Sequence, residues 1–157
     1  MSDSSDRFVA SARQLGLDIE IARFREGTRT ADDAARAIGC DVAQIVKSLV
    51  FMVGDEPLLA LTSGANRVDV KKLAAAIGVN KVRKANADEA RVASGYAIGG
   101  TPPFGHPAPV RTGLDPHLLT FEVVWAAGGT PDSVFPVEPH QLVDLCSAST
   151  ADFTEGL

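Results

Sequence analysis

The sequence has few of the residues that form disulfides or bind metal ions. Its 157 residues include 2 cysteines and 3 histidines. Cys40 and Cys146 lie far apart, and the histidines at 106, 117 and 140 are isolated from them and from one another. Zinc and iron–sulfur sites need closely spaced ligands, so we expect two free thiols, no metal site and no cofactor.

Several nucleotide-binding and catalytic motifs are also absent. The chain contains no Gly-x-Gly-x-x-Gly, no Gly-x-x-x-x-Gly-Lys-Ser/Thr and no Gly-x-Ser-x-Gly. The usual signatures of dinucleotide, nucleoside triphosphate and activated-serine sites are therefore missing. The chain starts with polar and acidic residues and has no apolar run of about 20 residues. We expect a cytoplasmic protein without a membrane partner.

The composition is that of a globular protein. With 45% hydrophobic and 22% charged residues, the chain can bury a core as one domain. We expect a single domain over 1–157, with residues 1–5 disordered.

Charge is unevenly distributed along the chain. The net charge is −5, yet 6 of the 15 basic side chains lie between positions 67 and 84, where Asp69 is the one acidic residue. Such a segment can hold phosphates, or it can be a solvated helix face followed by a basic loop. We call these six residues the basic segment: Arg67, Lys71, Lys72, Lys81, Arg83 and Lys84.

Apolar periodicity predicts alternating helices and strands. Spacing and capping residues indicate helices at about 5–15, 30–39, 68–77, 86–94 and 139–146. Strands are expected at 19–24, 49–53, 57–62, 119–126 and 134–137, the second and third joined in a hairpin at 54–56. This order predicts an α+β fold with a mixed, largely antiparallel sheet and flanking helices.

Lys47 is the first candidate functional residue. It begins an apolar strand in which Ile45, Val46, Leu49 and Val50 surround it. A lysine at the start of a strand is often simply solvated. In apolar surroundings its ammonium is poorly screened and attracts an anion, such as a phosphate or a developing oxyanion.

The second candidate is the loop 99–103, Gly-Gly-Thr-Pro-Pro. Glycine lets a backbone approach a ligand closely, and proline removes freedom and N–H donors. The loop can aim N–H groups at a carbonyl oxygen, or it can be a tight connection between a helix and a strand. The sequence leaves both interpretations open.

Three segments, 45–51, 66–74 and 95–105, resemble in order and spacing the YbaK and prolyl-tRNA-synthetase-associated editing domain family. The resemblance extends over 30–148. It implies a free-standing, metal-independent hydrolase that cleaves, in trans, the ester of mischarged aminoacyl-tRNA, tRNA-Pro included. It also implies a possible synthetase partner, since family members resemble an insertion domain of prolyl-tRNA synthetase.

The resemblance also assigns roles to residues. It implies a functional lysine at Lys47, with carbonyl-binding N–H groups at Gly100 and Thr101. The basic segment corresponds to a region that is expected to contact tRNA. The expected substrate-binding residues are Gly99, Pro102, Pro103, Phe104, Gly128, Gly129 and Phe51.

One departure affects the substrate. In the cysteine-selective branch we expect a serine before the glycine pair and an acidic residue several positions after it, where this chain has Ala127 and Val134. The amino acid removed stays open among alanine, serine, threonine and cysteine. A noncatalytic module that binds aminoacyl-tRNA, and a regulatory partner of a synthetase, are the alternative functions.

Overall fold

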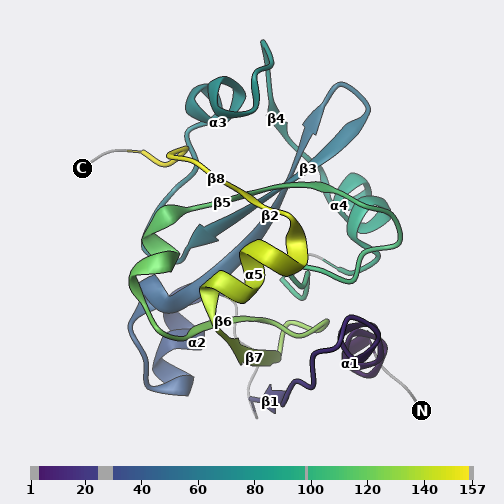
Figure 1. The fold of residues 1–157 in the computed structure, drawn as a ribbon, viewed down its shortest axis with the longest axis vertical. Coiled ribbons are helices and arrows are strands. Elements are labelled where there is room, and N and C mark those ends of the chain that lie inside the picture. Colours follow the sequence, from purple (N-terminus) through teal and green to yellow (C-terminus); the bar gives the residue numbers. More distant parts are fainter. Residues whose placement is uncertain (1–3, 25–29, 98, 156–157) are drawn as a thin grey trace.

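The computed structural model describes residues 4–24, 30–97 and 99–155. Eight strands form one mixed sheet in the order β1-β7-β6-β2-β3-β5-β8, with β4 paired to β2 (Figure 1). The strands are β1 Ala22–Arg23, β2 Ile45–Val53, β3 Glu56–Ser63, β4 Arg83–Lys84, β5 Arg111–Leu114, β6 Val124–Ala127, β7 Ser133–Val137 and β8 Ser149–Thr150. The expected mixed α+β fold is confirmed.

The described helices flank this sheet (Figure 1). They are α1 Ser4–Gln14, α2 Ala31–Ile38, α3 Val70–Ile77, α4 Ala87–Ser94 and α5 Pro139–Cys146, with 3-10 helices at Val42–Gln44 and Pro116–Thr120. Residues 1–3 of the segment expected to be disordered lie outside the described residues, whereas Ser4 and Ser5 begin α1. None of the helices in the described ranges is long and apolar enough to cross a bilayer.

The β2–β3 hairpin is the centre of the sheet. Its antiparallel register runs from Val46 opposite Ser63 to Val53 opposite Glu56. Side chains alternate along a strand, so β2 supplies both faces of the sheet. Val50 packs in the larger core with α1, α4 and α5, and Phe51 packs in a second core with α3. Both faces are buried, which explains why the hairpin is apolar almost throughout.

The other edge of β2 is divided between two strands. β6 runs parallel to its first residues, where Ile45 and Val46 are paired. β4 runs antiparallel to its last residues, where Phe51 and Met52 are paired. In the described part of the chain, no strand pairs with this edge between these two stretches. The sheet therefore has a gap beside residues 47–49, since the Val50 carbonyl already accepts a hydrogen bond from the Ala85 N–H.

The helix boundaries follow local capping signals in the sequence. Thr30 caps α2 by accepting a hydrogen bond from the Asp33 N–H, and Asn86 and Glu89 form a reciprocal capping box at α4. Asp69 caps α3, so that helix begins at Val70 rather than at residue 68. These caps satisfy N–H groups that the first helical turn leaves unpaired.

The strand expected at 119–126 is wrong in its first half. Asp115 caps a 3-10 helix through Thr120, and β6 starts only at Val124. Within β6, Val124 and Ala126 are buried while Trp125 is partly exposed. β4, β5 and β8, of two to four residues, were not predicted, since strands this short show no clear alternation.

We predict that Phe135→Ala lowers the free energy of unfolding by about 3–5 kcal/mol, because it leaves a cavity in the core. Phe135 is 0% exposed, and its ring centroid lies 5.1 Å from that of Phe8. Urea denaturation measures the change. The control Val92→Ala, at a position 81% exposed, should stay within about 0.5 kcal/mol of the parent protein. Equal midpoints for the two variants would contradict this assignment of the core.

Candidate active site at the gap in the sheet

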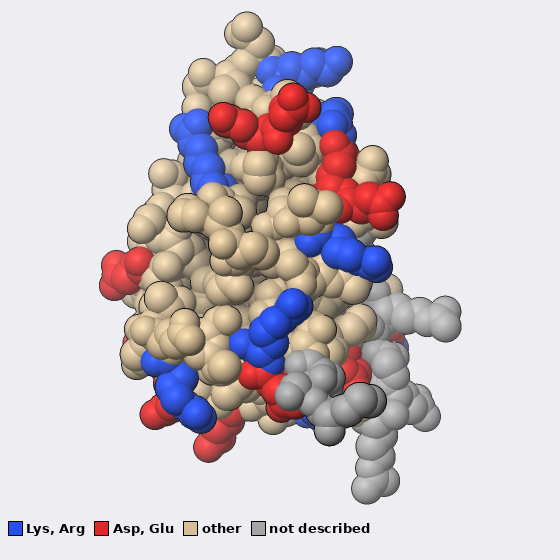
Figure 2. All heavy atoms as spheres, turned by 90° about the vertical axis from the view of Figure 1, so that its right-hand side faces the viewer, with Lys and Arg blue, Asp and Glu red and all other residues tan. Residues whose placement is uncertain are grey.

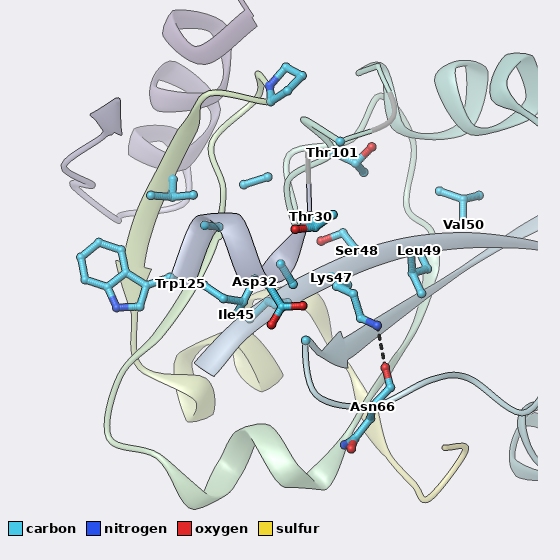
Figure 3. A pocket seen from close by; sticks show the side chains of 18 of the residues that line it. Thr30, Asp32, Ile45, Lys47, Ser48, Leu49, Val50, Asn66, Thr101 and Trp125 are labelled. Atoms are coloured by element: carbon cyan, nitrogen blue, oxygen red, sulfur yellow. Dashed lines mark hydrogen bonds between the residues drawn. The ribbon is translucent and has the colours of Figure 1, made fainter. Parts of the chain in front are cut away.

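A cavity of about 560 Å³ opens at the gap beside β2 (Figure 3). Residues 45–50 of β2 form one wall, and the loop after β3 and the start of α2 form others. Gly99 and Thr101 also line it, as does Lys47. These two belong to the loop 99–103, which we call the glycine loop. The cation and the loop, more than fifty residues apart in sequence, therefore border the same cavity.

Lys47 is half-buried in this wall. Its ammonium donates a hydrogen bond to the Asn66 carbonyl oxygen at 2.5 Å, which fixes the direction of the side chain (Figure 3). Burial lowers the pKa of Lys47, and the positive charges of Arg67 and Lys84 lower it further, with Asp115 opposing them. The lysine is thus a poorly solvated cation that gains from a bound anion.

A buried carboxylate holds the loop that binds Lys47. Asp115 is 2% exposed, and its Oδ2 accepts hydrogen bonds from the Asn66 amide at 2.8 Å and from the Ser63 N–H at 3.1 Å. Its Oδ1 accepts from the His117 N–H at 2.9 Å. Sequence reasoning missed both Asp115 and Asn66 as site residues. The only local signal was an aspartate before proline, which indicates a cap and not a contact with a distant loop.

The glycine loop lines the cavity, but one of its two expected N–H donors, that of Gly100, is already bonded within the protein. The Gly100 N–H donates to the Ala97 carbonyl at 3.0 Å, so it is not available to a substrate carbonyl. A Cβ at Gly100 would lie 2.8 Å from the Thr130 Cα. Gly100 therefore allows close packing of the loop, which corrects its expected role as a donor, while Gly99 and Thr101 face the cavity.

Four of the expected substrate-binding residues lie in the interior. Pro102, Pro103 and Phe104 are buried beyond the cavity wall, and the Phe104 ring packs 5.0 Å from that of Phe8. Phe51 is 3% exposed in the core beneath α3. None of the four lines the cavity, so they support its walls instead of contacting a ligand.

Gly128 and Gly129 serve packing between elements. A Cβ at Gly129 would lie 2.6 Å from the Ser4 carbonyl oxygen at the start of α1, and one at Gly128 would lie 2.5 Å from the Ile21 side chain. The pair is buried and does not line the cavity. The neighbouring residue Ala127 lines the cavity. The glycine turn therefore positions Ala127 without lining the cavity itself.

The basic segment separates into three groups. Arg67 and Lys84 line the cavity. Lys72 donates to the Thr154 carbonyl at 2.9 Å, and Arg83 forms two hydrogen bonds with Glu89 at 2.6 and 2.7 Å.

Lys71 and Lys81, the remaining two, are exposed. On the face shown in Figure 2, blue and red side chains are interspersed rather than gathered into one basic area. A phosphate-binding role is therefore best supported for the two cations that line the cavity.

The cavity combines a cationic part with an apolar part. Lys47, Arg67 and Lys84 line it together with the single carboxylate of Asp32, which leaves an excess of positive charge. The apolar part of the lining includes Ile45, Trp125, Ala127 and Val134. Such a site suits a ligand with a small apolar group beside an anionic one. In the described ranges, no three His, Cys, Asp or Glu side chains gather in a way that could hold a metal ion.

Comparison with known families agrees with this architecture. The model of the aminoacyl-tRNA editing domain matches residues 25–145. The chain belongs to this family. Its cavity, with Lys47 and the glycine loop among the lining residues, lies inside the matched region.

Relatives in this family resemble the chain over most of its length. YwhH of Bacillus subtilis, an uncharacterised protein, is 32% identical over 133 residues, which are 84% of each chain. EbsC of Enterococcus faecalis, named as a candidate Cys-tRNA(Pro)/Cys-tRNA(Cys) deacylase, is 27% identical over 83% of this chain and 80% of its own. A crystal structure described as a candidate trans-editing enzyme for prolyl-tRNA synthetase superposes with a TM-score of 0.93, at 41% identity over 99% of both chains.

We predict that Lys47 titrates below the ordinary lysine value of 10.5, because burial and the neighbouring cations disfavour its charged form. Lysines carrying ¹³C-methyl groups are followed by NMR as the pH is raised, and Lys47→Arg identifies the resonance. The chemical shift of the Lys47 methyl groups should change with pH with a midpoint below 10.5. A midpoint at or above 10.5 would contradict the prediction, because burial and the neighbouring cations would then not be the dominant influences on the pKa of Lys47.

Proposed function

We propose that this protein hydrolyses, in trans, the ester bond of mischarged aminoacyl-tRNA. Its membership of the editing-domain family supports the reaction, as does the naming of EbsC as a candidate deacylase. The observation that carries the proposal is the shared cavity, in which Lys47, Gly99 and Thr101 border one space.

The reaction needs positioning and charge stabilisation more than a strong nucleophile, because an aminoacyl ester is already activated. A water oxygen adds to the ester carbonyl carbon, and the carbonyl π electrons move to its oxygen. The tetrahedral intermediate then expels the terminal ribose oxygen, which takes up a proton originating from the water. The products are the free amino acid and a tRNA with its ribose hydroxyl restored.

Lys47 supplies a fixed positive charge for this reaction. The Asn66 carbonyl and the Asp115 carboxylate behind it hold the ammonium in place before the substrate arrives. At 4 Å and an effective dielectric constant of 20, two unit charges attract by about 4 kcal/mol. A terminal tRNA phosphate, or the oxyanion of the intermediate, is the group that Lys47 stabilises. Arg67 and Lys84 then contact neighbouring phosphates at the cavity wall.

The apolar wall receives the amino acid side chain. Ala127 and Val134 stand where a serine and an acidic residue are expected in the cysteine-selective branch, and both line the cavity. This wall supports a small aminoacyl group. A difference of one methylene changes discrimination by only about 1–3 kcal/mol, so the choice among alanine, serine, threonine and cysteine is a matter for direct measurement.

A deacylation panel tests the proposal. Purified protein is incubated with tRNA-Pro charged with alanine, serine, threonine or cysteine, and the loss of ester is followed against a blank without protein. We expect accelerated loss for at least one small amino acid, at the same rate with and without EDTA. Binding of every charged tRNA without faster hydrolysis would contradict the proposal and identify a noncatalytic module. A rate abolished by EDTA would overturn metal independence.

We further predict that Lys47→Ala lowers kcat/KM at least tenfold, about 1.4 kcal/mol in the barrier, because it removes the fixed cation from the cavity. Lys71→Ala, on the exposed face of α3, is the matched control and should stay within twofold. Circular dichroism establishes that both variants are folded. If a folded Lys47→Ala protein keeps its rate within about threefold, or roughly 0.65 kcal/mol, the role given to Lys47 is wrong.

A further inference from the structure

Ser48 has a buried side-chain oxygen that none of the described residues satisfies. It lines the cavity, and within residues 4–24, 30–97 and 99–155 its Oγ has no hydrogen-bond partner. Figure 3 shows its side chain on the side of β2 where Thr30 and Thr101 lie, while Lys47 points to the other side, toward Asn66. A buried hydroxyl without a partner is destabilising, so its presence in a cavity wall indicates a ligand atom that completes it.

The backbone of Ser48 also faces the gap. Along β2 the N–H and C=O groups point alternately to the two neighbouring strands. The Ile45 carbonyl points to the β3 side, where it accepts from the Gly64 N–H, and the Val50 carbonyl points to the other side, where it accepts from the Ala85 N–H. Ser48 is two residues from Val50, so the backbone N–H and C=O groups of Ser48 point to that other side as well.

On that side, the pairing with β6 ends at Val46 and the bonding with the β4 segment begins at Val50. Among the described residues, no strand pairs with Ser48 there. Its N–H thus points into the gap beside its own hydroxyl. Two hydrogen-bond donors of one residue are presented together to the cavity, held by the most extensively paired strand of the sheet.

The charges around the cavity decide which ligand atom these donors receive. Lys47, Arg67 and Lys84 outweigh Asp32 among the lining side chains, so the local field favours an oxygen that carries negative charge over a cation. The expected donor at Gly100 is already bonded to Ala97. Ser48 can take the place of that missing donor.

We propose that Ser48 is a catalytic residue whose hydroxyl and N–H bind the ester carbonyl oxygen of the substrate. This inference rests on the proposed deacylase function. When water adds to the carbonyl carbon, the electron pair of the breaking π bond moves to this oxygen, and both Ser48 donors strengthen their hydrogen bonds to it. The pair returns when the C–O bond to the ribose breaks, and Ser48 itself is unchanged.

The experiment compares Ser48→Ala and Ser48→Thr with the parent protein on the aminoacyl-tRNA that the parent hydrolyses fastest. Loss of one oxyanion donor costs at least about 100-fold in kcat, so Ser48→Ala should fall by about that factor. Ser48→Thr keeps the hydroxyl and should recover most of the rate. Because Oγ has no partner in the described part of the chain, the melting temperature of Ser48→Ala should be unchanged or raised.

Thr112→Val is the matched control. Thr112 is a buried hydroxyl residue on β5 whose Oγ1 donates to the Val110 carbonyl at 2.9 Å, and it does not line the cavity. Its replacement should lower the melting temperature and leave kcat/KM within twofold. A Ser48→Ala protein that behaves in this way, less stable but fully active, would overturn the proposal.

A second substrate distinguishes the carbonyl oxygen from the α-ammonium as the group bound. Nitrous-acid deamination of the same aminoacyl-tRNA gives the α-hydroxyacyl-tRNA, which keeps the ester and lacks the ammonium. Equal slowing of both substrates by Ser48→Ala supports the proposal, whereas slowing of the aminoacyl substrate alone overturns it. If the parent protein hydrolyses no aminoacyl-tRNA, the deacylase function fails and Ser48 fails with it. If the parent is active and Ser48→Ala stays within threefold, only the role of Ser48 is wrong.

Discussion

The incomplete pairing of one edge of β2 is the constraint on which the rest of the site depends. β6 takes the first residues of that edge and β4 takes the last, and the described strands leave the middle unpaired. Alternation along the strand then sends Lys47 to one face and Ser48 to the other, and both residues line the cavity beside this edge. One short stretch of strand thereby provides a cation and hydrogen-bond donors from a rigid support.

Distant parts of the chain hold this stretch in its working geometry. The Asp115 carboxylate, buried and fully engaged, fixes Asn66 and through it Lys47. On the other side, close packing of Gly100 against Thr130 brings Thr101 to the cavity. Neither contact involves a moving lid or an exposed ion pair. The donors and the cation are therefore organised before a ligand binds, which is the condition under which such groups lower a barrier most effectively.

The distribution of charge explains how an acidic protein can take a tRNA terminus as its substrate. The net charge is −5, yet three of the four charged side chains that line the cavity are basic. Arg83 and Lys72 are engaged with neighbouring protein groups. The local field at the cavity, more than the charge of the whole basic segment, therefore selects an anionic end group. The apolar wall beside it leaves space for a small side chain.

The sequence by itself determined the features that depend on neighbours along the chain. The caps at Thr30 and Asn86, the central hairpin and the candidacy of Lys47 could all be predicted, because helix ends and strand alternation are local. Only the tertiary structure decided which donors face the cavity. The N–H of Gly100 is bonded while the hydroxyl of Ser48 is not, and Asp115 reaches Asn66 across 49 residues. Whether a donor is satisfied depends on which groups folding brings close in space, and a local sequence pattern does not predict those groups.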